Sequence, residues 1–466
     1  MRQVSIMIVG LVTAVLCATA QGRLVFVPGE FTNLQEAVDS LATGDTIYVT
    51  APYLSGYGNR DVTADGKGIV FQSGLGAAGV TIDCQGNPGD EHRAFIFDSG
   101  EDSLTVIDGF RIVNGYADTG GAIYINRTAP TIRNSVFEDN YASLGGAIGG
   151  YQGAPTIDSC TFIDNEAYRG GAIDGLGRPV IRASRFTRNH AASRGGAVSD
   201  VHGAIVSDCM FDENTGGGAV FDLVGGSARL QRCVFARNES GGLSVVYGYQ
   251  SMQVERCTFY GNAYGMQALG DTYVVPRNTM IVFNRGDAAF CSITDSVTIL
   301  LNYCNVYGNV RNYYGCIADN LGEDGNISAD PMFCDTAAMD LTLLSSSACA
   351  TGGAGGVPIG AYGVGCTPTS IVDDPAGLPQ AFELQQNFPN PFNPATTIGF
   401  SVPIRTHVSV AVYNILGERV AVLFDQTAPA GSYEVTWDGT ASASGVYLYR
   451  LTAGDIVDTR KMLLLK

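Results

Sequence analysis

Three carboxylates and one histidine in this sequence could lie together and carry acid–base chemistry. When the chain is aligned on its repeated Gly-Gly pairs, Asp200 and Asp222 fall in one column, four residues past the second glycine. Asp174 falls one column earlier in the preceding repeat. His202 follows Asp200 by two residues, which places both on the same face of a strand. This arrangement suits acid–base catalysis, or binding of a cation such as Ca2+, and makes these four residues the catalytic candidates.

A simpler interpretation is that these residues are polar corners of an acidic surface. The sequence has no Gly-Asp-Asp, and no Arg-x-Lys pair or nearby lysine supports a glycosidase or a pectate lyase. Arg169 and Arg194 each stand just before a Gly-Gly pair and could bind acidic glycans, although solubility alone is a sufficient reason for them. No other cofactor is expected, and because no C-x-x-C occurs, neither is a zinc site.

The elements that would position these residues come from an internal repeat of 22 to 25 residues. Each repeat has an asparagine, an apolar residue three positions before it, and a small residue two positions before that. A Gly-Gly-Ala-Ile/Val motif runs in step with it, first at residues 120–123. The repeated asparagines are Asn140, Asn165, Asn189, Asn214, Asn238, Asn262, Asn284 and Asn309.

Short runs of alternating polarity between these anchors, such as residues 156–162, indicate strands with one buried face. One repeat cannot bury that face alone, but stacked coils can, with each strand pairing to its equivalent in the next coil. The pattern predicts a right-handed parallel β-helix of the pectate-lyase type, with a Phe ladder inside and an Asn ladder at one corner. In this register Phe211 points inward and Asp212 outward. The leucine-rich repeat has a similar period, but its L-x-x-L-x-L core is absent.

Both ends of the predicted solenoid carry closing segments. Residues 33–42 place apolar side chains on one helical face, which predicts an N-terminal capping helix before a first strand at 46–50. Residues 329–362 resemble the closing segment of bacterial right-handed β-helix proteins. Cys160, Cys209, Cys233 and Cys257 are expected as buried thiols in the ladder of small residues. Disulfides are expected among the cysteines from Cys291 onward, with no pairing deducible.

The N-terminus has the features of a secretory signal. Arg2 precedes a short apolar run and an A-x-A site, which predicts cleavage between Ala20 and Gln21. No later stretch reaches the length of a membrane span, so none is expected in the mature chain. A net charge of −18 argues against nucleic acid as a partner. Eleven cysteines follow the cleavage site, and this odd number leaves at least one without an intramolecular partner.

The repeat disappears after residue 366. Residues 367–379 are polar and contain proline, which indicates a linker, and several short strands in 380–466 then suggest a small Ig-like β-sandwich. A carbohydrate-binding or flagellar-hook-like sandwich is one interpretation. The sequence thus divides into a signal peptide (1–20), a β-helix (21–366), a linker (367–379) and a C-terminal domain (380–466).

Two resemblances extend this interpretation. The Gly-Gly-Ala-Ile and Phe-x-x-Asn motifs over roughly 105–310 resemble the repeats of chlamydial polymorphic outer-membrane proteins. Residues 380–466 resemble the type A C-terminal sorting domain of type IX secretion substrates. The motifs that carry this second resemblance are Phe388-Pro389-Asn390-Pro391-Phe392-Asn393-Pro394, Thr396-Thr397-Ile398, Trp437-Asp438-Gly439, Gly445-Val446-Tyr447 and the ending Lys461 to Lys466.

The second resemblance implies export through the periplasm by the type IX machinery, followed by release or anchoring at the cell surface. Two classes of function remain for the β-helix itself. One is a non-enzymatic surface protein, adhesin-like, that binds polysaccharide, cell-surface glycan or matrix. The other is a polysaccharide lyase or glycoside hydrolase. Because no recognisable catalytic set is present, the first class is favoured.

Overall fold

The computed structural model describes residues 22–224, 228–246, 251–291, 297–367, 382–403, 406–428, 431–453 and 456–465. It divides into two compact units, one ending at Cys366 and the other beginning at Thr367. The predicted signal peptide, its cleavage site at Ala20 and Gln21, and nearly all of the predicted linker lie outside the described residues.

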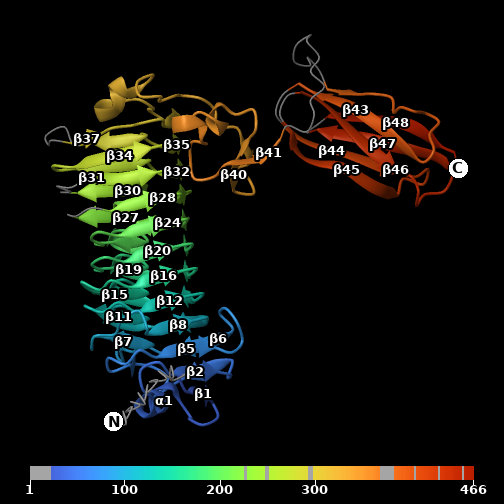
Figure 1. The fold of residues 1–466 in the computed structure, drawn as a ribbon. Helices are drawn as coiled ribbons and strands as arrows, with labels where there is room; N and C mark the ends of the chain where they lie inside the picture. The colour runs from blue at the N-terminus through green and yellow to red at the C-terminus, as the bar shows by residue number, and fades with distance from the viewer. Residues whose placement is uncertain are drawn as a thin grey trace, which may run out of the picture. The chain divides into compact units, whose positions relative to one another are not determined.

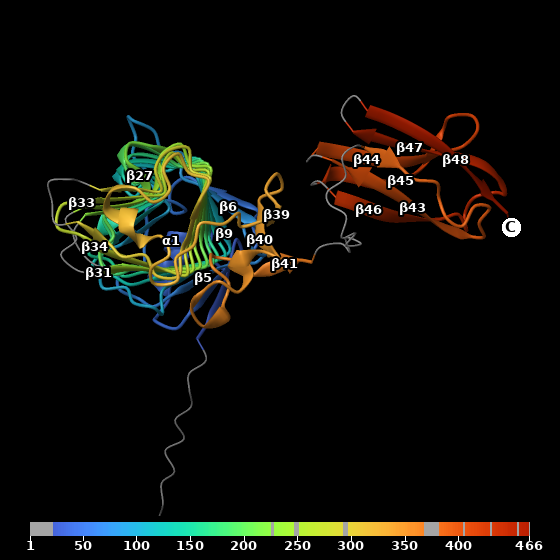
Figure 2. The ribbon, with the colours of Figure 1, turned by 90° about the horizontal axis from the view of Figure 1, so that it is seen from above.

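The first unit is a solenoid in which equivalent strands of successive coils pair in parallel (Figure 1). Seen from above, the coils overlie one another (Figure 2). In the described residues three long sheets run along the stack, so the expected fold class is confirmed.

The twelve-stranded sheet contains β1 (Leu24–Val27), β2 (Thr46–Val49), β5 (Val70–Ser73), β8 (Val106–Asp108), β12 (Thr131–Arg133), β16 (Thr156–Asp158), β20 (Val180–Arg182), β24 (Ile205–Ser207), β28 (Arg229–Gln231), β31 (Ser251–Glu255), β34 (Tyr273–Arg277) and β37 (Thr298–Ile299). The eleven-stranded sheet contains β3 (Tyr53–Ser55), β6 (Val80–Asp83), β9 (Phe110–Val113), β13 (Val136–Glu138), β17 (Thr161–Ile163), β21 (Arg185–Thr187), β25 (Met210–Asp212), β29 (Val234–Ala236), β32 (Thr258–Tyr260), β35 (Met280–Val282) and β38 (Asn305–Tyr307).

The ten-stranded sheet contains β4 (Val62–Thr63), β7 (Phe95–Phe97), β11 (Ile123–Asn126), β15 (Ile148–Tyr151), β19 (Ile173–Asp174), β23 (Val198–Ser199), β27 (Ala219–Val224), β30 (Gly241–Val246), β33 (Met266–Leu269) and β36 (Ala289–Cys291). A shorter sheet at one corner contains β10 (Tyr116–Thr119), β14 (Tyr141–Leu144), β18 (Glu166–Arg169), β22 (His190–Arg194) and β26 (Thr215–Gly216).

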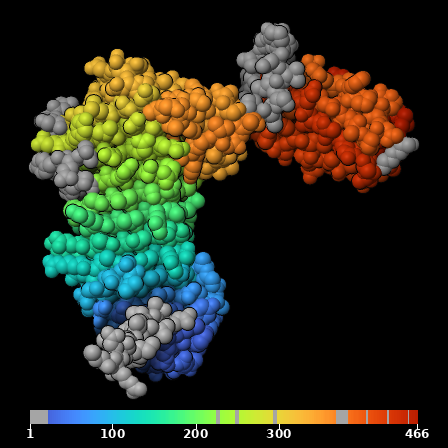
Figure 3. Space-filling view, in the orientation of Figure 1, coloured from blue at the N-terminus to red at the C-terminus, as the bar shows by residue number. Residues whose placement is uncertain are grey.

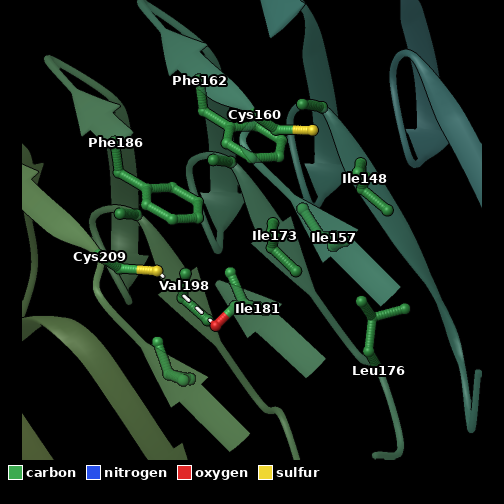
Figure 4. Packing of buried hydrophobic residues seen from close by; sticks show 14 of the residues in the cluster. Ile148, Ile157, Cys160, Phe162, Ile173, Leu176, Ile181, Phe186, Val198 and Cys209 are labelled. Atoms are coloured by element: carbon green, nitrogen blue, oxygen red, sulfur yellow. Dashed lines mark hydrogen bonds between the residues drawn. The ribbon is translucent and has the colours of Figure 1, made fainter. Parts of the chain in front are cut away.

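Aromatic side chains stack along the interior. Phe162 and Phe186 are fully buried on paired strands, with ring centroids 4.6 Å apart and planes 3° from parallel (Figure 4). The same stacking continues through Phe211 and Phe235 to Phe259. The predicted cysteines lie beside this stack; Cys209, for example, is buried and donates its Sγ–H to the Ile181 carbonyl.

The repeated asparagines form a hydrogen-bonded ladder at the corner after the eleven-stranded sheet. The side-chain oxygen of Asn189 accepts hydrogen bonds from the backbone N and Nδ2 of Asn165, at 3.2 and 2.9 Å. Its own Nδ2 donates to Asn214 and to the Phe162 carbonyl. Each buried amide therefore satisfies backbone groups of neighbouring coils, which explains why one residue type recurs at this position.

The N-terminal end is capped by α1 (Leu34–Ser40), close to the predicted range. The side chain of Asn33 caps the helix by accepting a hydrogen bond from the backbone N of Glu36, and Glu36 accepts one from the backbone N of Thr32. Leu34 and Val38 are buried against the first coils, so the helix covers apolar surface that an open end would expose.

The closing segment spans residues 315–366, which include the predicted 329–362, and runs beside the upper coils. It contains η1 (Gly315–Asn320), η2 (Ala348–Ala350), η3 (Ala354–Gly356) and the strands β39 (Phe333–Asp335), β40 (Asp340–Leu344) and β41 (Val364–Cys366). Figure 3 shows this segment, in orange, against the side of the upper coils. Its buried Leu341 and Ala361 pack against Val234 and Ala236 on the outer face of β29. Disulfides join Cys291 to Cys316 and Cys334 to Cys366.

The second unit consists of two antiparallel sheets that share one core. One sheet contains β42 (Glu383–Leu384), β43 (Ala395–Val402) and β46 (Gly431–Asp438). The other contains β45 (Arg419–Ala428), β44 (Thr406–Tyr413), β47 (Gly445–Ala453) and β48 (Ile456–Leu464), in that order. Phe400 of the first sheet and Val410 and Tyr449 of the second are buried in the common core.

Candidate functional site

Paired glycines form the corner that holds the candidate residues. Gly170 adopts φ +65°, a conformation that other residues rarely take. A Cβ on Gly171 would lie 2.2 Å from the carbonyl oxygen of Gly196 in the next coil, so only glycine fits there. The corner therefore turns tightly over the strand that follows it, which is β19 in this coil.

The three carboxylates do not form the columns that the Gly-Gly alignment predicts. In the structure Asp174 pairs with Ser199, and Ser199 pairs with Asp222. Asp200 lies one position beyond this column, at φ +51°, where β23 has already ended. The prediction that Asp200 and Asp222 share a column is therefore wrong.

The cause of this error is a shortened corner. Twenty-five residues separate the paired Ile173 and Val198, but only 23 separate Val198 from its partner Phe221. The shorter coil turns at Gly216 and Gly218, which both adopt positive φ. Val198 follows its Gly-Gly pair by two residues, but its partner Phe221 follows Gly218 by three. Alignment on the glycines is therefore wrong by one residue in this coil, and an error of one residue assigns a side chain to the opposite face of the strand.

Burial separates the candidates into two groups. The side chains of Asp174 and Asp222 are only 1% and 3% exposed. The glycine corner covers Asp174, because a Cβ on Gly170 would lie 2.7 Å from the Cβ of Asp174. Asp200 is 26% exposed and His202 is 51% exposed. A polymeric substrate could therefore reach Asp200 and His202, but neither buried carboxylate.

Arg169 binds two of the carboxylates. Its Nε and Nη2 lie 2.8 and 2.9 Å from the two carboxylate oxygens of Asp174. Its Nη2 also lies 3.2 Å from Asp200 Oδ2, and Asp200 Oδ1 lies 3.3 Å from His202 Nε2. The four side chains form one connected network in which both oxygens of Asp174 are already occupied.

Asp222 has a weaker partner. The Nε of Arg194 lies 3.6 Å from its Oδ2, and neither of its buried oxygens accepts a hydrogen bond from a described residue. The buried hydroxyl of Ser199, the next residue in the column, also has no hydrogen-bond partner among the described residues. The polar atoms of this column therefore have fewer hydrogen-bond partners than those of the Arg169 network.

Burial changes the protonation of both buried carboxyls. It raises the pKa of Asp174 to about 6, although the hydrogen bonds from Arg169 act in the opposite direction. The same hydrogen bonds raise the pKa of Arg169, so the attraction is present but smaller than the cost of removing the carboxylate from water. Burial likewise raises the pKa of Asp222, although the Ser244 side chain and the positive charge of Arg194 both act to lower it.

Alignment on the glycine pairs missed several residues of this region. Ser199 and Ser244 flank Asp222 in the strand register. Tyr264 packs over the same surface, since its ring lies 1.9 Å from where a Cβ on Gly241 would be. Burial raises the pKa of Tyr264 to about 12, and the charge of Asp222 adds to this effect. In the part of the chain that the structure describes, no group of three or more His, Cys, Asp or Glu side chains is placed to hold a metal ion.

Tyr449 and Thr396 hold the beginning of the C-terminal motif in place. The backbone N of Asn387 donates to the hydroxyl of Tyr449 at 2.8 Å, and that hydroxyl donates to the Gln385 carbonyl at 2.7 Å. The Asn387 side chain donates to Thr396 Oγ1 and to the Pro389 carbonyl. The repeated polar and proline residues of this motif therefore fix its path against the sandwich.

The fold defines a β-solenoid protein that carries a C-terminal β-sandwich. Residues 76–281 match the family model described as right handed beta helix region. Residues 386–465 match the model of the secretion system C-terminal sorting domain. No curated protein matches the chain.

The sorting domain places the protein outside the cell or at its surface and implies an interaction with the secretion machinery, so the predicted localisation is confirmed. None of the helices in the described residues is long and apolar enough to cross a membrane.

Proposed function

We propose that the β-helix is a cell-surface or secreted binding protein that recognises a glycan or matrix polymer without cleaving it. One observation carries this proposal. Asp174 and Asp222 are buried, and both oxygens of Asp174 are held by Arg169. A general acid or base must reach the atom whose proton it transfers, and these carboxyls do not reach the surface.

The accessible groups around them are suited to binding. Tyr168 is 62% exposed and lies next to Arg169 on β18. Arg194 pairs in register with Arg169 on the next coil, and its side chain is 37% exposed. Tyrosine offers a flat apolar surface, and an arginine fork binds carboxylate or sulfate groups with two parallel hydrogen bonds. Arg169, Arg194, Asp200 and His202 form a polar face, which we call the Arg194 face, and Tyr168 is exposed on the same strand as Arg169.

The coil repeat supports the same proposal. Its Gly-Gly-Ala-Ile and Phe-x-x-Asn motifs resemble those of the polymorphic outer-membrane proteins, and this resemblance implies a protein displayed on the cell surface. An adhesin-like role needs a long exposed scaffold and no catalytic group. The solenoid provides such a scaffold.

Binding of the full-length secreted protein to immobilised polysaccharides tests this proposal. The panel contains uronate-containing, sulfated and neutral polymers. We expect the combined Tyr168→Ala and Arg194→Gln changes to weaken binding at least tenfold. Tyr57→Ala is the matched control, because Tyr57 is 97% exposed near the N-terminal end. Equal binding by all three proteins would place the ligand elsewhere, and no binding to any polymer would remove support for glycan recognition.

Polysaccharide cleavage is the second candidate function. The raised pKa of Asp174, about 6, favours it, because a carboxyl that keeps its proton near neutral pH can act as a general acid. For this function the glycine corner over Asp174 would have to open. Shortening of any panel polymer by the wild type, but not by Asp174→Asn, would support cleavage.

A further inference from the structure

The four-stranded sheet of the sorting domain has two outer strands, and the chain itself covers the C-terminal part of one of them, β48. The backbone N of Phe392 donates to the Leu463 carbonyl, and the backbone N of Leu465 donates to the Phe392 carbonyl, both at 3.0 Å. Asn390 Oδ1 accepts a hydrogen bond from the backbone N of Leu463, and Gln386 Nε2 donates to the Lys461 carbonyl. Residues 386–392 therefore close the edge at β48 from Lys461 onward.

The opposite edge, β45, remains open. This strand pairs only with β44, and among the described residues its backbone makes no hydrogen bond to any other strand. In such a strand every second residue directs its N–H and C=O away from the sheet. β45 has ten residues and contains neither lysine nor proline, which commonly protect exposed edges. Two register shifts against β44, at Val420 and Leu423, interrupt its row of outward-facing groups.

Exposed apolar side chains lie in the first half of this edge, whereas its second half exposes Asp425, Gln426 and Thr427. Val420 and Val422 are 41% and 46% exposed. Ile415 and Leu416, in the turn that leads into β45, are 74% and 78% exposed. The neighbouring outer strand β46 differs, because its exposed positions carry Glu434 and Thr436. An unpaired backbone edge combined with apolar side chains is complementary to another extended strand with apolar side chains.

We propose that β45 is the edge by which the secretion machinery recognises this domain, and that the machinery supplies an extended strand which adds to the sheet there. The match to a secretion sorting domain identifies the class of partner. Residues 386–392 cover β48 from Lys461 onward, whereas no described residue covers β45, and this difference favours β45 as the edge at which a strand is added.

Export of the full-length chain in a host with type IX machinery tests the proposal. One variant combines Val420→Lys and Val422→Lys, which places charge on the β45 edge. The matched control combines Ile456→Lys and Val457→Lys on β48, where the native side chains are 45% and 58% exposed. We expect the β45 variant to lower the exported amount at least tenfold and to collect in the periplasm, while the control is exported like the wild type.

A second measurement distinguishes lost recognition from misfolding of the β45 variant. A photo-crosslinking residue placed at Val422 in the otherwise native chain should form an adduct with a component of the machinery, and one placed at Val457 should not. Normal export of a folded β45 variant would overturn the proposal, as would the absence of any adduct from Val422. A concentration-dependent dimer that only the β45 variant loses, with export unchanged, would assign this edge to a second copy of the chain.

Discussion

Both carboxylate oxygens of Asp174 are bound by a single guanidinium, that of Arg169, at 2.8 and 2.9 Å beneath a glycine corner. Such a pair is geometrically favourable, but it forms where the carboxylate is 1% exposed. The desolvation of a buried ion pair commonly offsets much of its attraction. We therefore interpret this pair as a structural element of the coil rather than as a reactive carboxyl.

The pH dependence of stability should reflect this burial. Because the pKa of Asp174 is raised to about 6 in the folded protein, the folded state binds this proton more tightly than the unfolded chain does. The stability from Asp174 is fully present below the unfolded pKa and is lost as the pH rises through 6. Relative to Asp174→Asn, the wild type should gain about 2–3 kcal/mol in unfolding free energy between pH 7 and pH 4. Urea titrations of both proteins across this range measure the difference, and a gain with rising pH would contradict it.

The interior Phe stack should tolerate truncation poorly. Phe211 is fully buried between Phe186 and Phe235, with ring centroids 4.7 and 4.6 Å away. Phe211→Ala should cost about 3–5 kcal/mol, because the rigid coils above and below cannot collapse into the cavity. Urea unfolding of the variant tests this, and a cost below about 1 kcal/mol would show that the stack contributes little.

Asp212, which the alternation places outside, should nevertheless be important. Its side chain is 2% exposed and accepts hydrogen bonds from Arg237 at 3.0 and 2.6 Å, with Arg185 at 3.4 Å. Asp212→Ala should therefore cost about 1–3 kcal/mol rather than being neutral. Asp164→Ala is the matched comparison, since Asp164 also pairs with an arginine, Arg188, but is 38% exposed. It should cost less than about 1 kcal/mol, and equal costs would mean that burial does not matter here.

The sequence predicted the features whose contacts repeat in every coil, and it missed those that depend on one irregular coil or on a distant segment. The Asn ladder and the Phe stack repeat at one position per coil, so their spacing alone predicted the solenoid. The displacement of Asp200 could not be predicted, because three glycines shorten one coil and no neighbouring repeat shows this. The burial of Asp212 was missed as well, because its arginine partners come from the coils on either side, while the distant closing segment covers the neighbouring Met210 and Val234. The C-terminal domain was predictable from motifs whose residues, such as Pro389 and Thr396, bond to one another.

Removal of the sorting domain should separate folding from export. The solenoid and the sandwich have their own cores and form separate units. Deletion of residues 380–466 should therefore leave a folded β-helix in the periplasm, and fusion of these residues to a reporter with a signal peptide should send it outside. Cell fractionation measures both outcomes. Finding the truncated protein at the cell surface would contradict the role of this domain in export.

The length of a bound polysaccharide before and after incubation with the secreted protein tests the proposed function most directly. The polymer is one that the wild type binds and that the combined Tyr168→Ala and Arg194→Gln changes release. If the Arg194 face only binds, size-exclusion chromatography will show the same chain length after prolonged incubation at pH 5 and at pH 7. Progressive shortening by the wild type, abolished by Asp174→Asn, would contradict the account and identify the buried carboxyl as catalytic.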